Sequence, residues 1–237
     1  MPSKPSKADS MRIRPVIVII IAAMALVGAA VVWAFNGADT AAAPTPLTGE
    51  FTVLIDAGHG GFDIGCKGTV TGVEEAELNL DVAKELERKL RQAGANIIMT
   101  RDDENAIGGT KDEDMQNRRE IINKSGADIM ISIHMNSFPD DPQISGPQVF
   151  YYDGSVKGAE LAGIIQNELN SQTGGNRGIV GSNYYVLRAG NMPSVIVECG
   201  FLTNSRDEEL LSDAAYRKKL AGYIAEAAVE YLNVNGG

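Results

Sequence analysis

The chain contains two histidines, His59 and His134, and each lies where a predicted strand ends in a polar loop. His59 follows an apolar run and precedes two glycines, whereas His134 ends the apolar run 129–133. Two imidazoles at the ends of strands can meet at one edge of a sheet, and functional loops of α/β domains gather at the carboxyl ends of strands. Imidazole is a common zinc ligand. The two histidines therefore indicate a metal site.

A third ligand must come from elsewhere, because a catalytic zinc commonly has three protein ligands and one open position for water. Two adjacent glutamates, Glu74 and Glu75, open a predicted helix. Thr71 followed by Glu74 three residues later matches a capping box, in which the glutamate turns back to the helix start. This pattern favours Glu75 as the metal ligand, but by itself it leaves both glutamates open.

Glu198 ends an otherwise apolar predicted strand. A carboxylate at such a position is costly to bury without a partner. Beside a zinc-bound water it can accept a proton as general base and return it to a leaving amine. The alternative is a structural salt bridge, for which Arg188 is the candidate partner.

The elements that must position these side chains alternate along the chain. Several predicted strands are continuously apolar, which is typical of strands covered on both faces. Strands alternating with amphipathic helices predict an α/β layered domain. The predicted strands are 51–56, 95–100, 128–133, 147–152, 183–187 and 194–199. The first predicted helix opens with residues 71–75 and ends at Gly94, and the others cover about 112–124, 156–171 and 213–232.

The N-terminal part has a different character. Residues 15–35 carry no charged side chain and are long enough to span a bilayer as a helix. The basic residues within 1–14 predict a cytoplasmic N-terminus, so the rest of the chain is expected on the extracytoplasmic face of the cell membrane. Residues 36–49 predict a linker, and 50–237 one catalytic domain. A cleaved signal peptide is the alternative to an uncleaved anchor.

The charge of the chain argues against a nucleic-acid partner. Residues 1–14 carry four basic and one acidic side chain, a formal +3, so the net charge of −10 leaves −13 on the rest. Such an acidic domain would repel phosphates. Cys66 and Cys199 are too few for a disulfide framework. We expect two small, partly buried thiols, with one bond between them left open.

Five motifs in a fixed order then indicate a family. They are DAGHGG at 56–61, Glu-x-x-x-Asn-Leu at 75–80, Thr100-Arg101, SIHMNS at 132–137 and VECGFLTN at 197–204. Together they resemble the zinc-dependent N-acetylmuramoyl-L-alanine amidases of the amidase-3 family, over about residues 51–232. These enzymes cleave the amide that joins N-acetylmuramic acid to the L-alanine of the peptidoglycan stem peptide. The resemblance implies a mostly parallel six-stranded sheet flanked by helices.

The resemblance also implies roles for individual residues. His59, Glu75 and His134 match the ligands of Zn²⁺, which resolves the choice between Glu74 and Glu75. Glu198 matches the catalytic glutamate. A departure is Ala76, because many relatives carry lysine after the ligand glutamate; this change should not touch the metal.

Three further residues are candidates for substrate binding. Arg177 and Arg188 correspond to arginines of the family that can hold a stem-peptide carboxylate by a bidentate contact. Asn136 follows the second histidine by two residues and is expected to line the same cleft. The alternatives are solvated loop arginines and, for Asn136, a turn residue.

The short architecture, an anchor followed by a bare catalytic domain, is similar to the germination-specific (CwlD-like) type. That similarity implies a role in spore-cortex maturation, through formation of muramic-δ-lactam. General wall turnover or cell separation is the alternative. Because some relatives need an activator protein, such a partner is left open. A zinc exopeptidase and an inactive wall-binding protein are readings from other classes, which the intact set of ligand candidates disfavours.

Overall fold

The computed structural model describes residues 45–235. The predicted cytoplasmic segment 1–14, the predicted anchor 15–35 and most of the predicted linker 36–49 lie outside these residues. Between residues 45 and 235, no helix combines the length and the apolar character that crossing a membrane requires.

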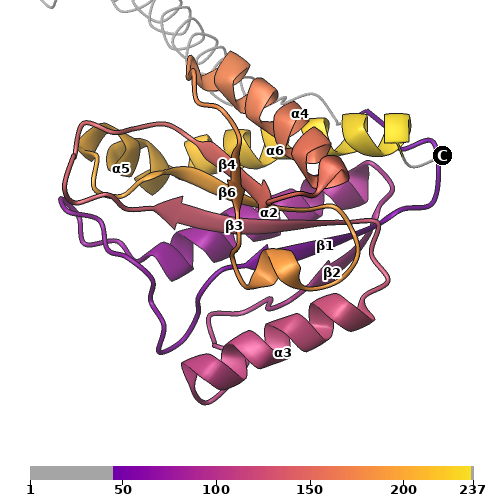
Figure 1. Cartoon of the computed structure of the whole chain (residues 1–237). Coiled ribbons are helices and arrows are strands. Elements are labelled where there is room, and N and C mark those ends of the chain that lie inside the picture. Colours follow the sequence, from indigo (N-terminus) through magenta and orange to yellow (C-terminus); the bar gives the residue numbers. More distant parts are fainter. Residues whose placement is uncertain (1–44, 236–237) are drawn as a thin grey trace, which may run out of the picture. The chain divides into compact units, whose positions relative to one another are not determined.

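The described chain forms one six-stranded mixed sheet with the strand order β2-β1-β3-β6-β4-β5 (Figure 1). Pairing is parallel throughout except between β4 and β6, which run antiparallel. The late strand β6 thus lies between β3 and β4. This mostly parallel sheet agrees with the predicted fold class. The strands are β1 (Thr52–Ala57), β2 (Asn96–Met99), β3 (Ile129–Asn136), β4 (Gln148–Tyr152), β5 (Val180–Ser182) and β6 (Ser194–Phe201).

Helices cover both faces of the sheet (Figure 1). Three long helices, α2, α4 and α6, pack on one face, and α3 lies on the other. The short α5 precedes α6. The helices are α2 (Glu75–Gln92), α3 (Lys111–Lys124), α4 (Val156–Thr173), α5 (Ser205–Ser212) and α6 (Ala214–Asn235), with a 3₁₀ turn η1 at Val186–Arg188.

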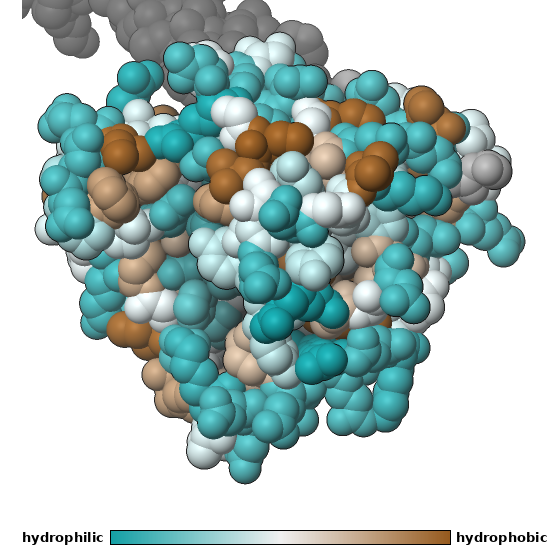
Figure 2. Space-filling model, viewed as in Figure 1, coloured by the Kyte–Doolittle hydropathy of each residue, from teal (hydrophilic) through white to brown (hydrophobic). Residues whose placement is uncertain are grey.

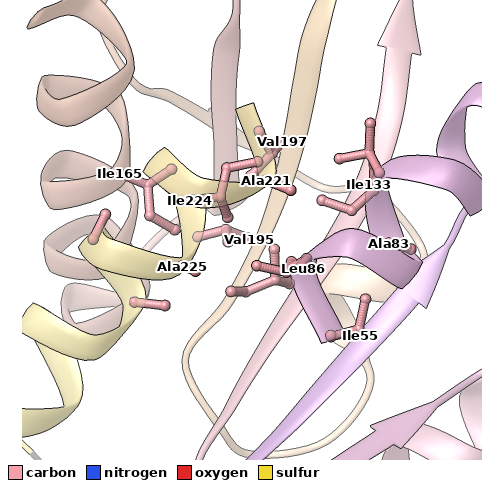
Figure 3. Packing of buried hydrophobic residues seen from close by; sticks show 14 of the residues in the cluster. Ile55, Ala83, Leu86, Ile133, Ile165, Val195, Val197, Ala221, Ile224 and Ala225 are labelled. Carbon is pink, nitrogen blue, oxygen red and sulfur yellow. The ribbon is translucent and has the colours of Figure 1, made fainter. Parts of the chain in front are cut away.

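The two faces explain the continuously apolar strands. In β1, Val53 and Ile55 enter the larger core under α2, α4 and α6, whereas Leu54 enters the smaller core under α3. Figure 3 shows Leu86 of α2 and Ile224 of α6 meeting the sheet in the larger core. The outer surface in the same view as Figure 1 is largely hydrophilic, with small separate apolar areas (Figure 2). Packing on both faces thus holds the position of the central strands.

One predicted strand is wrong. Residues 183–187 do not join the sheet; instead 180–182 form β5 and 186–188 form η1. Val186 and Leu187 are buried because they pack into the smaller core from a turn, and a short apolar run does not distinguish that from a strand. The helix α5 was not predicted. Its cap is clear, since the Asn204 side chain accepts hydrogen bonds from the backbone of Arg206 and Asp207.

Candidate metal centre and active site

Three side chains from different elements converge at the carboxyl edge of the sheet. His59 follows β1, Glu75 is the first residue of α2, and His134 lies in β3. Glu75 Oε1 is 3.2 Å from His59 Nε2 and 2.9 Å from His134 Nδ1. The two imidazole rings are 5.0 Å apart at an interplanar angle of 78°. The structure therefore brings together the two histidines and the glutamate that the sequence pointed to.

The arrangement fits a divalent metal ion. One potential ligand atom from each of the three residues lies within 4.8 Å of the others. Around a tetrahedral zinc with ligand distances of 2.0–2.1 Å, ligand atoms are about 3.3 Å apart. The two nitrogen–oxygen separations at Glu75 are close to that value. Two imidazoles and one carboxylate are also a donor set that zinc accepts at catalytic sites.

Glu75 is held by several neighbours. Its Oε2 accepts a hydrogen bond from the Cys66 backbone at 2.9 Å, and its Oε1 accepts from Asn79 Nδ2 at 3.2 Å. Burial alone would raise the pKa of Glu75, but the contacts with His134 and His59 outweigh it and hold the pKa well below its ordinary value. The carboxylate is therefore charged and ready to bind a cation. The spacing Glu-x-x-x-Asn has a physical reason, because residues four apart face each other on a helix.

Two glycines make room for the ligands. A Cβ atom at Gly58 would lie 2.2 Å from the His134 ring, and one at Gly65 would lie 2.4 Å from Glu75 Oε2. Both distances are far inside van der Waals contact. Any side chain at either position would displace a candidate metal ligand.

The capping-box interpretation is wrong, although it favoured the same glutamate. Glu74 occupies the N-cap of α2 but makes no capping hydrogen bond, and it pairs with Lys67 at 3.0 Å. The Thr71 hydroxyl binds Glu208 of α5 instead of the helix start. The threonine hydroxyl thus donates to a carboxylate 137 residues away in sequence. A local sequence pattern cannot predict such a contact.

Glu198 lies beside the candidate ligands, because it is paired with His134 in the register of β3 and β6. Its Oε2 is buried and has no hydrogen-bond partner among the described residues. Burial raises the pKa of Glu198 to about 7, against the partly opposing effect of His134. The alternative of a salt bridge to Arg188 does not hold among the described residues, because the exposed Arg188 guanidinium lies over the Tyr185 ring instead. Glu198 is thus a carboxylate with a raised pKa in a cleft, which is characteristic of a proton-transfer group.

A cavity of about 410 Å³ opens onto these residues. Its wall contains charged side chains as well as aromatic and aliphatic ones. Such a mixed wall suits a substrate with both amide and apolar parts. The lining residues are Asp56, Gly58, His59, Asp63, Lys111, Asp114, Met115, Arg118, His134, Tyr184, Tyr185, Val186, Ile196 and Glu198.

The three predicted substrate-binding residues do not line this cavity. Arg177 donates to the Ser145 carbonyl at 2.8 Å and stacks on Phe201, and Asn136 accepts from the Ser137 backbone. Arg188 lines a separate pocket of about 250 Å³. Tyr184 and Tyr185 line the cavity, but no sequence pattern marked them as site residues, because they lie in the segment predicted as a strand.

Two other observations complete the description of the site. The Nδ1 atom of His59 lies 3.0 Å from Asp63 Oδ2, without the alignment of a hydrogen bond. A carboxylate on the outer nitrogen of a ligand histidine is usual at metal centres. Cys66 and Cys199 both carry free thiols, so the disulfide left open by the sequence does not form.

Two imidazoles and a carboxylate beside a buried glutamate, at the edge of a mostly parallel sheet, are an arrangement that metal-dependent hydrolases use. The family model of N-acetylmuramoyl-L-alanine amidases (Amidase_3) matches residues 53–230, and the chain belongs to this family. Its enzymatic activity is accordingly that of an N-acetylmuramoyl-L-alanine amidase, which acts on the peptidoglycan of the cell wall.

Similar proteins include cell-wall and germination enzymes. The germination-specific N-acetylmuramoyl-L-alanine amidase of Bacillus subtilis is 32% identical over 201 residues, which are 81% of this chain and 83% of that protein. The amidase LytC of the same organism is 35% identical over 193 residues, 78% of this chain but 36% of LytC. The structure of the CwlD amidase from Clostridioides difficile, in complex with the GerS lipoprotein, is 33% identical with a TM-score of 0.75. That match covers 78% of this chain and 100% of CwlD.

Substitution of Gly65 tests whether the close approach to Glu75 matters for metal binding. We expect Gly65→Ala to weaken zinc binding roughly tenfold or more, because the new Cβ would displace the ligand carboxylate. Zinc affinity can be measured by competition with a chelator. The matched control is Gly72→Ala: Gly72 has φ 73, close to φ 69 at Gly65, but open space around the added Cβ. Equal zinc affinity in the two variants would contradict the prediction.

Proposed function

We propose that the chain is a zinc-dependent peptidoglycan amidase in which His59, Glu75 and His134 hold the metal. The observation that carries this proposal is the convergence of both imidazoles on one oxygen of Glu75, with the unpartnered Glu198 beside them. The family match favours the amidase over a zinc exopeptidase. The complete donor set disfavours an inactive wall-binding protein.

In this proposal the protein's own groups divide the work. A bound zinc ion would supply Lewis acidity, polarising the scissile carbonyl and lowering the pKa of a water molecule. Glu198 accepts the proton of the attacking water and delivers it to the departing alanine nitrogen. Its pKa of about 7 suits both transfers, because a group that titrates near neutral pH can accept and release a proton.

Replacing Glu198 by glutamine separates proton transfer from metal binding. We expect Glu198→Gln to retain zinc and to lose hydrolysis by roughly 10²–10⁴-fold, because an amide cannot accept the proton. Zinc content by mass spectrometry and release of stem peptide from purified muropeptides measure the two effects. The control is Glu74→Gln, which removes a partly exposed charge next to the ligand Glu75. Wild-type turnover in Glu198→Gln would show that the assigned role is wrong.

Substrate binding is proposed to involve two arginines that contact the wall of the cavity from outside. Tyr185 lines the cavity, and both Arg119 and Arg188 stack on its ring at 5.6 Å. No ion pair within residues 45–235 involves either guanidinium. Two available guanidinium groups can bind a carboxylate of the stem peptide in the bidentate manner. Arg188 thus keeps its predicted role in this proposal. Arg177 instead binds the Ser145 carbonyl and the Gln148 side chain, and Asn136 binds the Ser137 backbone.

Truncating these arginines should affect substrate binding more than chemistry. We expect Arg119→Ala and Arg188→Ala each to raise KM roughly three- to tenfold for muropeptides whose stems carry free carboxylates. Muropeptides with amidated stems should show little change, because no anion is lost. Steady-state kinetics on the two substrates measure the difference. Arg88→Ala, which removes an exposed arginine paired with Glu85 on α2, is the control. An equal effect on both substrates would argue against a carboxylate contact.

The biological setting is proposed to be the spore cortex, where such enzymes prepare muramic-δ-lactam. Similarity to the germination-specific amidase and to CwlD supports it. The apolar segment 15–35 and the basic residues before it support a single membrane anchor with the catalytic domain outside the cytoplasm. The complex of CwlD with the GerS lipoprotein supports a partner protein for this chain as well. Vegetative wall turnover is the alternative.

Complementation tests the cortex role. A Bacillus subtilis strain that lacks its germination-specific amidase should regain muramic-δ-lactam when it expresses this chain, as measured by muropeptide analysis of spores. The chain carrying Glu198→Gln is the control for catalysis. In the same cells, the tagged wild-type chain should fractionate with membranes, whereas recovery from the medium would indicate a cleaved signal peptide. A cortex without muramic-δ-lactam, together with altered vegetative muropeptides, would favour the alternative of wall turnover.

A further inference from the structure

The backbone at His59 has an unusual conformation. Its φ of 60° is the one positive value at a non-glycine residue within 45–235. Gly60 and Gly61 follow with φ of 136° and 55°. A side chain with a Cβ atom rarely adopts a positive φ, and two glycines leave the following segment free to turn. Local chain preference therefore does not hold His59 in place, and tertiary contacts must do so.

Arg118 of α3 supplies these contacts. Its Nη2 donates to the His59 carbonyl at 2.5 Å, and its Nη1 donates to the Ala57 carbonyl at 2.7 Å. The guanidinium thus binds the backbone both at the end of β1 and at the candidate ligand itself. A guanidinium carries its donors on three nitrogens in a rigid plane and can bind these two carbonyls and two carboxylates at once, whereas a lysine offers three donors from one nitrogen.

The guanidinium is itself fixed by two buried carboxylates. Nε donates to Asp114 Oδ2 and Nη1 to Asp56 Oδ1, both at 2.7 Å. Asp56 is held in turn by the hydroxyls of Thr100 and Ser132. The Arg118 side chain is 2% exposed. These contacts leave the guanidinium little freedom, so the position of the His59 carbonyl is fixed relative to the sheet and to α3.

A second buried arginine provides a useful comparison. Arg101 donates to the carbonyls of Ala57, Gly58 and Ala76. It therefore ties the same loop to α2, but no hydrogen bond joins it to His59 in the part of the chain that the structure describes. Arg118 alone of the two binds the backbone of the histidine whose ring faces Glu75.

We propose that Arg118 is a positioning residue for the metal centre, which holds the His59 backbone in the left-handed conformation so that the imidazole faces Glu75 before metal binds. The inference rests on the proposed zinc site. The buried ion pairs of Arg118 with Asp56 and Asp114 would then contribute to metal affinity, and not only to the stability of the fold. Loss of the fork should free His59 to leave its positive φ, and the imidazole would then point toward Glu75 in only part of the molecules.

Arg118→Lys tests the proposal, because it keeps the charge between Asp56 and Asp114 but loses the fork. We expect zinc affinity, measured by chelator competition at a temperature where all variants are folded, to fall roughly tenfold or more. The matched control is Arg217→Lys. Arg217 also joins a carboxylate, Asp81, to a backbone carbonyl, but it lies outside the site. We expect this control to keep wild-type zinc affinity whatever its melting temperature.

Nuclear magnetic resonance of the metal-free protein gives a second readout, since the chain has two histidines and their ring signals can be resolved. We expect one set of His59 ring signals in the wild type and broadened or doubled signals in Arg118→Lys. Unchanged zinc affinity with superimposable ring signals would overturn the proposal. If the wild type itself did not bind zinc, the proposed function would fail, while the ring signals would still test the positioning of His59.

A further variant covers the case in which Arg118→Lys does not fold. Asp114→Asn removes one of the two charges that fix the guanidinium and leaves the contact with Asp56. We expect a smaller loss of zinc affinity in the same direction, with broadened His59 signals. Wild-type affinity and wild-type signals in a folded Asp114→Asn protein would overturn the proposal.

Discussion

The convergence of two imidazoles on one buried carboxylate is the interaction on which the rest of the structure depends. Glu75 lies at the start of α2, and its partners come from the end of β1 and from β3. For these groups to meet, β1 and β3 must be neighbours in parallel register and α2 must begin at their carboxyl ends. The crowding of these side chains requires glycine at positions 58 and 65. Their burial also raises the pKa of Glu198, and buried carboxylates near the site pair with Arg118.

Much of this arrangement could be predicted from the sequence, because its signals are local. Apolar runs covered on both faces identified most strands, and chemistry-bearing residues at strand ends identified the two histidines and Glu198. The helix with residues 78, 82, 86 and 90 on its buried face followed from a period close to 3.6. The choice of Glu75 over Glu74 came from family motifs, not from physical pattern, since the capping box that favoured it does not form.

The remaining features depend on contacts between distant residues. Thr71 donates a hydrogen bond to Glu208, and Arg118 donates one to the His59 carbonyl. Val186 and Leu187 are buried although they lie in a turn. No periodicity or spacing in the sequence predicts these contacts. The aromatic wall of the cavity was missed for the same reason. A tyrosine pair before a short apolar run is compatible with a strand or with a turn, and tertiary packing decides between them.

The sheet order also has a consequence for the time at which activity arises. The strand β6 lies between β3 and β4 although both precede it in the chain, and it carries Glu198 opposite His134. A ribosome that has released the first 190 residues has therefore produced the two imidazoles and Glu75 but no central strand to join the halves of the sheet. The sheet and the site are complete only once β6, which begins at Ser194, has been synthesised. A chain that ends before Ser194 therefore lacks both the central strand of the sheet and Glu198, the residue opposite His134.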